Sequence, residues 1–232
     1  MRLYSHGFDR KGSNVGGVIM KIQWFGHSFF LVTSQGGKKI VVDPFDQSVG
    51  YPLPQVSANM VCVSHSHYDH NNVQIIGGNP EIIQKAGIYV RDGYQIQGFQ
   101  TYHDHKKGKE RGENVVYRIE IDGLSLIHAG DMGMLPSLEE IESWKPLDIL
   151  LVPVGGIYTI NGHEAQTLVE HLKPRVVIPM HYRTPLLKFE LQPVENFTYQ
   201  FFKVKTLSET QVEITRENLP ESTEIWIFPI PK

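Results

Sequence analysis

The chain has 232 residues, 41% of them hydrophobic, and a formal net charge of −3. This length suits one large domain or two small ones, with enough apolar residues for a sizeable core. The small negative charge excludes a strong overall attraction to nucleic acid, although a local basic groove would not show in this sum. Nucleic acid is therefore not an expected partner, and nothing in the pattern indicates the oligomeric state.

The sequence shows no pattern for membrane insertion or export. No uncharged run approaches the ~18 residues that a membrane span needs, and the first residues lack the apolar core of a signal peptide. The single cysteine, Cys62, rules out an internal disulfide and fits a reducing compartment. We therefore expect a soluble, cytoplasmic protein. Residues 1–19 are polar and glycine-rich, which predicts a flexible N-terminal extension before one domain over residues 20–232.

The first part of the chain has the pattern of short strands separated by turns. β-Branched and aromatic runs alternate with breaks that contain glycine. These runs predict strands over residues 20–25, 29–33, 39–42, 61–64, 88–91 and 95–102. Residues 73–86 predict a helix or turn region, which Gly77-Gly78-Asn79-Pro80 interrupts.

The second part of the chain mixes strands and helices. Strands are predicted over residues 115–121, 124–128, 149–152, 176–178, 212–215 and 224–228, and helices over 138–144, 161–172 and 194–202. Asn161 and Glu164, three residues apart, have the pattern of a capping box at a helix start. The order of elements predicts a mixed α/β or α+β domain with sheets at its centre.

A cluster of metal-binding residue types follows the predicted strand over residues 61–64. Within six positions stand His65, His67, Asp69 and His70. Packing does not explain this cluster, because each group must be desolvated and still find a partner. Catalytic zinc sites use imidazole and carboxylate ligands and keep one position for water. We expect the first two histidines to reach one ion, and Asp69 with His70 to reach a second ion ~3.5–4 Å away.

Two ions need further ligands from distant segments. The outstanding candidates are His103, Asp131 and His181, each of which stands just beyond a predicted apolar strand. His105 is the alternative to His103, because side chains two residues apart share one face of a strand.

These motifs together resemble one known family. His65-Ser66-His67-Tyr68-Asp69-His70 matches the HxHxDH signature of the metallo-β-lactamase superfamily, and His103, Gly130-Asp131 and His181 follow in the order that its later motifs require. Four segments around these residues also resemble the branch of small Zn-dependent hydrolases that includes L-ascorbate-6-phosphate lactonase-like proteins. They are Trp24-Phe25-Gly26-His27-Ser28, Val42-Asp43-Pro44-Phe45, His128-Ala129-Gly130-Asp131 and Ile178-Pro179-Met180-His181-Tyr182. The resemblance runs from about Met20 to the C-terminus.

The resemblance implies a fold, a metal centre and an activity. The fold is α+β, an αββα sandwich in which two mixed β-sheets pack face to face, with helices on the outer faces and the metal site at one edge. Two Zn²⁺ ions are implied, with Mn²⁺ or Fe²⁺ as alternatives. By position, the ligands of the first ion are His65, His67 and His103, those of the second are Asp69, His70 and His181, and the bridging ligand is Asp131. The activity is that of a metal-dependent hydrolase, whose bridging hydroxide attacks an ester, lactone or phosphodiester-type small-molecule substrate.

Other residues near these motifs are candidates for supporting roles. Asp69 could steer a proton, and His128 could reach a metal or support a ligand, so both are candidate catalytic groups. We expect His27, next to Gly26, to be a hydrogen-bonding loop residue near the site. Possible substrate contacts are Tyr158, His163, Tyr182 and Arg183, for which ordinary packing or a surface position is the alternative.

One basic cluster stands between the predicted strands over residues 95–102 and 115–121. It consists of Lys106, Lys107, Lys109 and Arg111, with Gly108 and Gly112 interleaved. Two interpretations stay open: a mobile solvated loop, or a lip that attracts an anionic substrate.

Three other functions of this fold also stay open. The first is an iron-dependent oxidoreductase. Flavodiiron proteins carry a glutamate at the position of His67 and an appended flavin domain, and this chain has neither. A mononuclear iron dioxygenase is compatible with imidazole and carboxylate ligands. A nuclease is disfavoured, because the chain lacks both a broad basic bias and room for the inserted domain of the RNA-processing members. The third alternative is a non-catalytic sensor that keeps the metal ligands.

Overall fold

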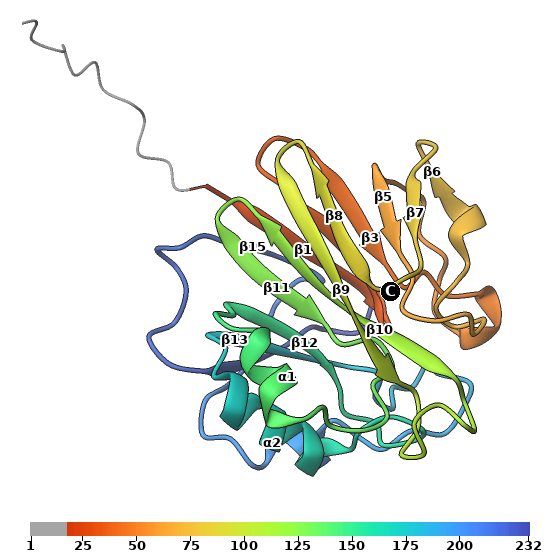
Figure 1. Ribbon diagram of the computed structural model, residues 1–232, viewed down its shortest axis with the longest axis vertical. Helices are drawn as coiled ribbons and strands as arrows, with labels where there is room; N and C mark the ends of the chain where they lie inside the picture. Colours follow the sequence, from red (N-terminus) through yellow and green to blue (C-terminus); the bar gives the residue numbers. More distant parts are fainter. Residues whose placement is uncertain (1–17) are drawn as a thin grey trace, which may run out of the picture.

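Two β-sheets packed face to face dominate residues 18–232, the part of the chain that the computed structural model describes (Figure 1). The predicted extension over residues 1–19 lies outside the described residues except for its last two. No helix in the described part has the length and apolarity that a membrane span requires.

The first sheet has six strands. Across the sheet they are β15 (Gln211–Ile214), β1 (Met20–Gly26), β2 (Phe29–Thr33), β3 (Lys39–Val42), β5 (Met60–Cys62) and β7 (Glu81–Ile83). Pairing is antiparallel from β15 to β3 and parallel from β3 to β7, so the sheet is mixed.

The second sheet has eight strands. Across the sheet they are β14 (Val204–Thr206), β16 (Glu224–Ile227), β13 (Val176–Met180), β12 (Ile149–Pro153), β11 (Leu124–His128), β10 (Glu113–Ile121), β9 (Tyr94–Tyr102) and β8 (Gly87–Arg91). Pairing is parallel from β14 to β11 and antiparallel from β11 to β8. A separate parallel pair joins β4 (Val56–Ser57) to β6 (Ile76–Gly77).

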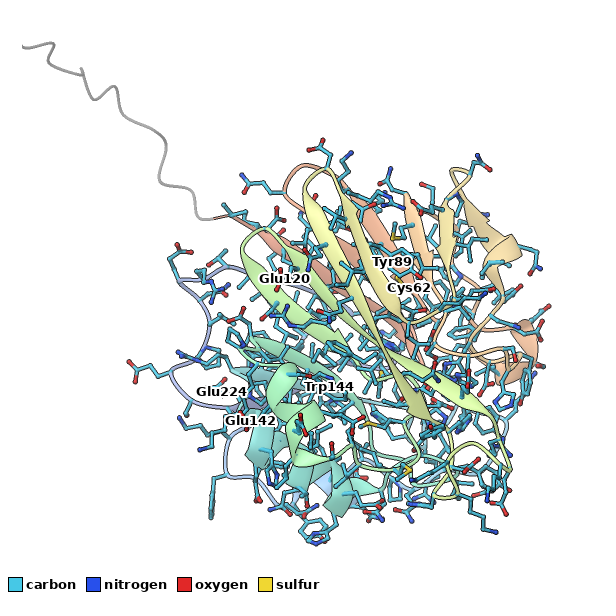
Figure 2. The ribbon with its side chains drawn as sticks, in the orientation of Figure 1. Cys62, Tyr89, Glu120, Glu142, Trp144 and Glu224 are labelled. Carbon is cyan, nitrogen blue, oxygen red and sulfur yellow. The ribbon has the colours of Figure 1, made fainter. Side chains whose placement is uncertain are left out.

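The inner faces of the sheets share one apolar core. On β1 the inner residues Met20, Ile22 and Trp24 are buried while the residues between them are partly exposed, as expected of a strand with one face in a core. Cys62 and Tyr89 belong to opposite sheets, and their side chains contribute to this packing (Figure 2). The hydroxyl of Tyr117 on β10 donates to the carbonyl of Val63 at 2.9 Å, so a hydrogen bond also joins the sheets.

The outer faces are covered in two different ways. The helices are α1 (Leu138–Ser143), α2 (Gly162–Leu172) and α3 (Glu195–Thr198); α2 packs against the other two and lies on β12 (Figure 1). The strands β11, β12 and β13 are therefore buried along their whole length. Over the six-stranded sheet, Phe29 and Val41 pack against Phe45 and Val49 of the following loops, which include the 3₁₀ turn η1 (Gln47–Val49). The predicted sandwich is confirmed, with loops in place of helices on this side.

Most predicted elements are confirmed within one or two residues, and the capping box of Asn161 and Glu164 at the start of α2 is present. The helix predicted over residues 194–202 and the helix or turn region predicted over residues 73–86 are each confirmed only in part. The helix over residues 194–202 is reduced to α3. Residues 73–86 contain no α-helix; they form the 3₁₀ turn η2 (Val73–Ile75) and the short strands β6 and β7.

Candidate metal centre

The candidate ligands lie at one edge of the sandwich because of strand direction. The strands β9, β11 and β13 run in the same direction, so His103, Asp131 and His181, which follow them, come to the same end of the eight-stranded sheet. In the other sheet β1, β3 and β5 also share one direction, which brings His27 to the end where the segment 65–70 begins. Each sheet thus contributes part of the cluster.

The candidate ligands fall into groups whose nitrogen and oxygen atoms lie within 4.8 Å of one another. These groups are His65, His67 and His103; His27, Asp69, His70 and His181; and His65, His70 and Asp131. The first group matches the predicted ligands of one ion. The second contains the three predicted ligands of the other ion together with His27, which the sequence had suggested only as a nearby loop residue.

Asp131 is the point at which these groups meet. Its carboxylate is buried, and four imidazole Nε2 atoms surround it. The Nε2 atoms of His103 and His181 lie 3.3 and 3.1 Å from Oδ2. On the other side, Nε2 of His70 lies 3.2 Å from Oδ1, and Nε2 of His65 lies 3.9 Å from Oδ2. Oδ2 therefore faces imidazole nitrogens from both groups, and Oδ1 faces His70 of the second group.

The donor atoms fit a metal ion better than they fit one another. Nε2 of His65, Nε2 of His70 and Oδ1 of Asp131 are buried and make no hydrogen bond, although imidazole and carboxylate stand close together. Buried polar atoms normally have a partner, and a cation would provide one here. Imidazole with carboxylate is also the donor set typical of catalytic zinc sites.

The protonation states support the same conclusion. Burial lowers the pKa values of His65, His67 and His103, so these rings are neutral at pH 7 and carry a free lone pair. At His70 burial opposes the charged form, but the carboxylates of Asp131, Asp69 and Asp43 outweigh it and raise the pKa well above its usual value. The potential at this position therefore favours a positive charge.

Asp43 and Ser64 orient two of the imidazoles. Asp43 accepts hydrogen bonds from the Ser64 amide and hydroxyl at 2.7 and 2.6 Å, and from Nδ1 of His70 at 2.8 Å. Because the Ser64 hydroxyl donates to Asp43, it accepts from Nδ1 of His65 at 2.9 Å. Nδ1 of each ring thus carries a proton, and Nε2 of each ring points toward Asp131, where it would bind a metal ion.

Asn114 on β10 holds the backbone of Asp131. Its side chain donates to Thr101 and to the Ala129 carbonyl, and its Oδ1 accepts from the Asp131 amide at 2.9 Å. Gly130 has a φ of +56°, and a Cβ there would overlap Asn114 and Ser64. This close approach explains the glycine of the Gly130-Asp131 pair.

A pocket of about 380 Å³ opens above the cluster. Its floor and walls are formed by His67, Tyr68, Asp69, His103, Arg111, Asp131, Ile157, Tyr158, His181, Phe189 and Glu190. Predicted site residues therefore share this pocket with apolar and charged side chains from three distant loops.

Comparison with known proteins shows which family has these features. A model of the beta-lactamase superfamily domain matches residues 21–181. A UPF0173 metal-dependent hydrolase of Pelotomaculum thermopropionicum is 32% identical over 240 residues, which cover 89% of this chain and 100% of the relative. A UPF0173 metal-dependent hydrolase of Thermococcus onnurineus is 30% identical over 199 residues, which cover 72% of this chain and 86% of the relative. The chain belongs to the UPF0173 metal-dependent hydrolases of the metallo-β-lactamase superfamily.

A solved structure agrees with this family assignment. It is a candidate Zn-dependent hydrolase of the metallo-β-lactamase superfamily from Thermotoga maritima, and it superposes with a TM-score of 0.77 at 36% identity. The superposition covers 91% of this chain and 99% of that chain. The match to the beta-lactamase superfamily domain, over residues 21–181, includes every candidate ligand from His27 to His181.

Four of the predicted supporting residues lie away from the pocket of this metallo-β-lactamase domain. His128 is fully buried; its Nε2 donates to the Ser28 carbonyl and its Nδ1 accepts from the Gly130 amide, so its predicted catalytic role is corrected to a structural one. Tyr182 packs in the core against Trp24. His163 and Arg183 are exposed and do not line the pocket. Tyr158 is the one residue of the predicted substrate set that does.

The sequence pattern indicates some of the other residues of this site and leaves others without any signal. His103 is buried against Asp131 whereas His105 is exposed, which agrees with the preference for His103. Asp43 had a signal, because it stands in the motif Val42-Asp43-Pro44-Phe45, but its role depends on a distant partner. The apolar wall of Ile157 and Phe189 had no signal in the sequence.

Proposed function

We propose that this protein is a dinuclear hydrolase, with zinc in both positions, that acts on an ester, lactone or phosphodiester bond of a small molecule. One observation supports it above all: two groups of candidate ligands meet at the buried Asp131, whose Oδ2 lies 3.3 Å from Nε2 of His103 in one group and 3.1 Å from Nε2 of His181 in the other. The motifs that resemble L-ascorbate-6-phosphate lactonase-like proteins place a lactone among the substrates to be tested. The single buried Cys62 favours a reducing compartment such as the cytoplasm.

When bound, two zinc ions would supply the bridging hydroxide at neutral pH and polarise the scissile oxygen. The protein's own contribution is to hold the ligands in place and to handle the proton. Burial lowers the pKa of His27 to about 4, so its ring is neutral. Its Nε2 lies 3.2 Å from Oδ2 of Asp69 and donates to it, which holds this carboxylate at the pocket wall in position to accept or pass on a proton.

The pocket favours a small substrate. Its volume of about 380 Å³ lies in the range of small-molecule sites, which is roughly 300–1,000 Å³. Ile157, Tyr158 and Phe189 supply apolar surface to the lining of this pocket. A polymeric nucleic acid would instead need an extended basic groove.

The test is the metal content of the purified protein together with a substrate panel of esters, lactones and phosphodiesters. We expect two zinc equivalents per chain and turnover that chelation removes. His67→Ala and Asp131→Ala should each abolish turnover while the protein stays folded, because the ligands lie on loops outside the core. His163→Ala is the matched control, since this histidine is exposed on α2.

Other outcomes would favour the alternative functions. Near wild-type turnover of the His67 or Asp131 variant would refute the dinuclear mechanism. Iron in anaerobically purified protein together with oxygen consumption would identify an oxidoreductase. Cleavage of nucleic acid alone would indicate a nuclease, and zinc-loaded protein that hydrolyses nothing in the panel would favour a sensor.

A further inference from the structure

We propose that Arg111 binds an anionic group of the substrate, a carboxylate or a phosphate, so that the molecule cleaved over Asp131 is an anion. Arg111 and Asp131 line the same pocket, Asp131 within the candidate metal cluster and Arg111 on a loop beside it. The identity of the reaction rests on the proposed function, whereas the binding of the anion can be tested without any turnover.

The loop that carries Arg111 is wound around one carboxylate. Asp104, which is 5% exposed, accepts backbone hydrogen bonds through Oδ1 from Lys106 at 2.7 Å and Gly108 at 3.0 Å. Through Oδ2 it accepts from Glu110 at 3.0 Å and Arg111 at 2.8 Å. The backbone of Arg111 is therefore fixed relative to His103, which precedes Asp104. These hydrogen bonds support an ordered lip at Arg111, whereas the three lysines of the basic cluster are exposed, as the alternative of a solvated loop expects.

The guanidinium of Arg111 is held in place without being neutralised. Its Cζ lies 3.9 Å from the ring centroid of Tyr158, in the geometry of a cation–π contact. No carboxylate in the described chain lies within salt-bridge distance of it, and its Nε is buried without a hydrogen-bond partner. A planar guanidinium with free N–H groups binds the two oxygens of a carboxylate or phosphate as a fork.

Arg111 is the only member of the basic cluster that lines this pocket. Lys106 pairs with Glu110 at 2.5 Å on the surface, and Lys109 is exposed outside the lining. One charge opposes the proposal: Glu190 also lines the pocket. It is exposed and makes no ion pair with Arg111 within 4 Å, so it leaves the guanidinium free while its own charge repels an anion in the pocket. Removing the charge of Glu190 should therefore strengthen anion binding, whereas removing the charge of Arg111 should weaken it.

The experiment compares esters that share one leaving group and differ at the far end. The substrates are mono-4-nitrophenyl adipate, its methyl-capped diester, and a 4-nitrophenyl ester that ends in a phosphate. We measure kcat/KM of the zinc-loaded protein, corrected for uncatalysed hydrolysis, and take the ratio of each anionic ester to the capped one. For Arg111→Gln this ratio should fall about tenfold or more, as expected for the loss of a charge-assisted bidentate contact. The ratio is measured once for the carboxylate ester and once for the phosphate ester. The ester whose ratio falls more in Arg111→Gln carries the anionic group that Arg111 prefers.

Three further variants distinguish a direct contact between Arg111 and the anion from a general effect of the charge around the pocket. Arg111→Lys keeps the charge but not the fork, and should recover part of the ratio. Glu190→Gln should raise the ratio about two- to threefold, since it removes a partly screened repulsion. Lys109→Gln removes a positive charge from the same loop outside the pocket and should leave the ratio unchanged. Equal ratios in Arg111→Gln and the wild type, or an equal fall in Lys109→Gln, would overturn the proposal.

A binding measurement keeps this proposal separate from the hydrolase assignment. Benzoate and phenylphosphonate are titrated calorimetrically into zinc-loaded wild type and Arg111→Gln, whose metal contents are first shown to be equal. The Kd of at least one anion should rise about tenfold or more in the variant. If no ester is cleaved but this change is found, the proposed function fails and the anion site stands. If esters are cleaved but both Kd values are unchanged, the anion site fails alone.

Discussion

At the scale of single residues, Asp43 stabilises the candidate centre without facing the pocket. Its buried carboxylate accepts from Nδ1 of His70 directly, and through Ser64 it sets the orientation of His65. Partners that orient a metal-binding histidine in this way raise its basicity and fix its tautomer. Burial opposes ionisation of Asp43, but His70 outweighs it and holds the pKa of the carboxyl below its usual value.

We predict that Asp43→Asn weakens metal binding about 10- to 100-fold, because an amide is a poorer acceptor for the two ring-orienting hydrogen bonds. Competition with a chromophoric chelator measures the affinity. Asp46→Asn is the control: this aspartate caps the 3₁₀ turn η1 through the Ser48 amide and has no contact with the candidate ligands. An unchanged affinity of the Asp43 variant would show that the histidines are oriented by other groups.

At the scale of elements, the strand ends explain which parts of the site could be predicted. The segment 65–70 was recognisable because its candidate ligands stand close together in the sequence. Asp131 and His181 were recognisable because each follows an apolar strand. Asp43 and Arg111 act through partners far away in sequence, so a linear pattern could not assign their roles. The strands of the region 73–86 were not predicted for a related reason: β7 exists through its parallel pairing with β5, and that non-local pairing leaves only a weak local signal.

The contact between the sheets at Tyr117 can be tested in the same way. We predict that Tyr117→Phe lowers the free energy of unfolding by about 1–2 kcal/mol, since the buried carbonyl of Val63 loses its donor. Urea unfolding with and without the substitution measures the change. Tyr199→Phe is the control, because this tyrosine is 77% exposed at the end of α3. Equal stabilities of the Tyr117 variant and the wild type would mean that this side-chain hydrogen bond does not stabilise the contact between the sheets.

At the scale of the whole molecule, the core between the sheets contains one titratable thiol. Cys62 on β5 is fully buried, and burial, reinforced by Asp43 and Glu81, raises its pKa well above the usual value. The native state therefore keeps this proton at alkaline pH, whereas the unfolded chain releases it above a pKa of about 8.5. A raised native pKa makes the stability fall as the pH rises above that of the unfolded thiol.

We therefore predict that the wild type loses about 2 kcal/mol more stability than Cys62→Ala between pH 7 and pH 10. Denaturant unfolding of both proteins at both pH values gives the difference. Each protein serves as its own reference at pH 7, so the loss of packing in the variant cancels. Parallel pH dependence of the two proteins would mean that Cys62 already titrates in the native state.

The candidate ligands are divided between the two sheets: His27 and the segment 65–70 follow strands of one, and His103, Asp131 and His181 follow strands of the other. An ion bound among them would act as a clasp between the two sheets at this edge, in addition to the backbone hydrogen bond from the His181 amide to the His27 carbonyl at 3.4 Å. Binding to the native state alone adds its free energy to folding. The lifetime of the folded chain in the cell would then follow the supply of metal, and a shortage would expose the protein to degradation as well as silence it.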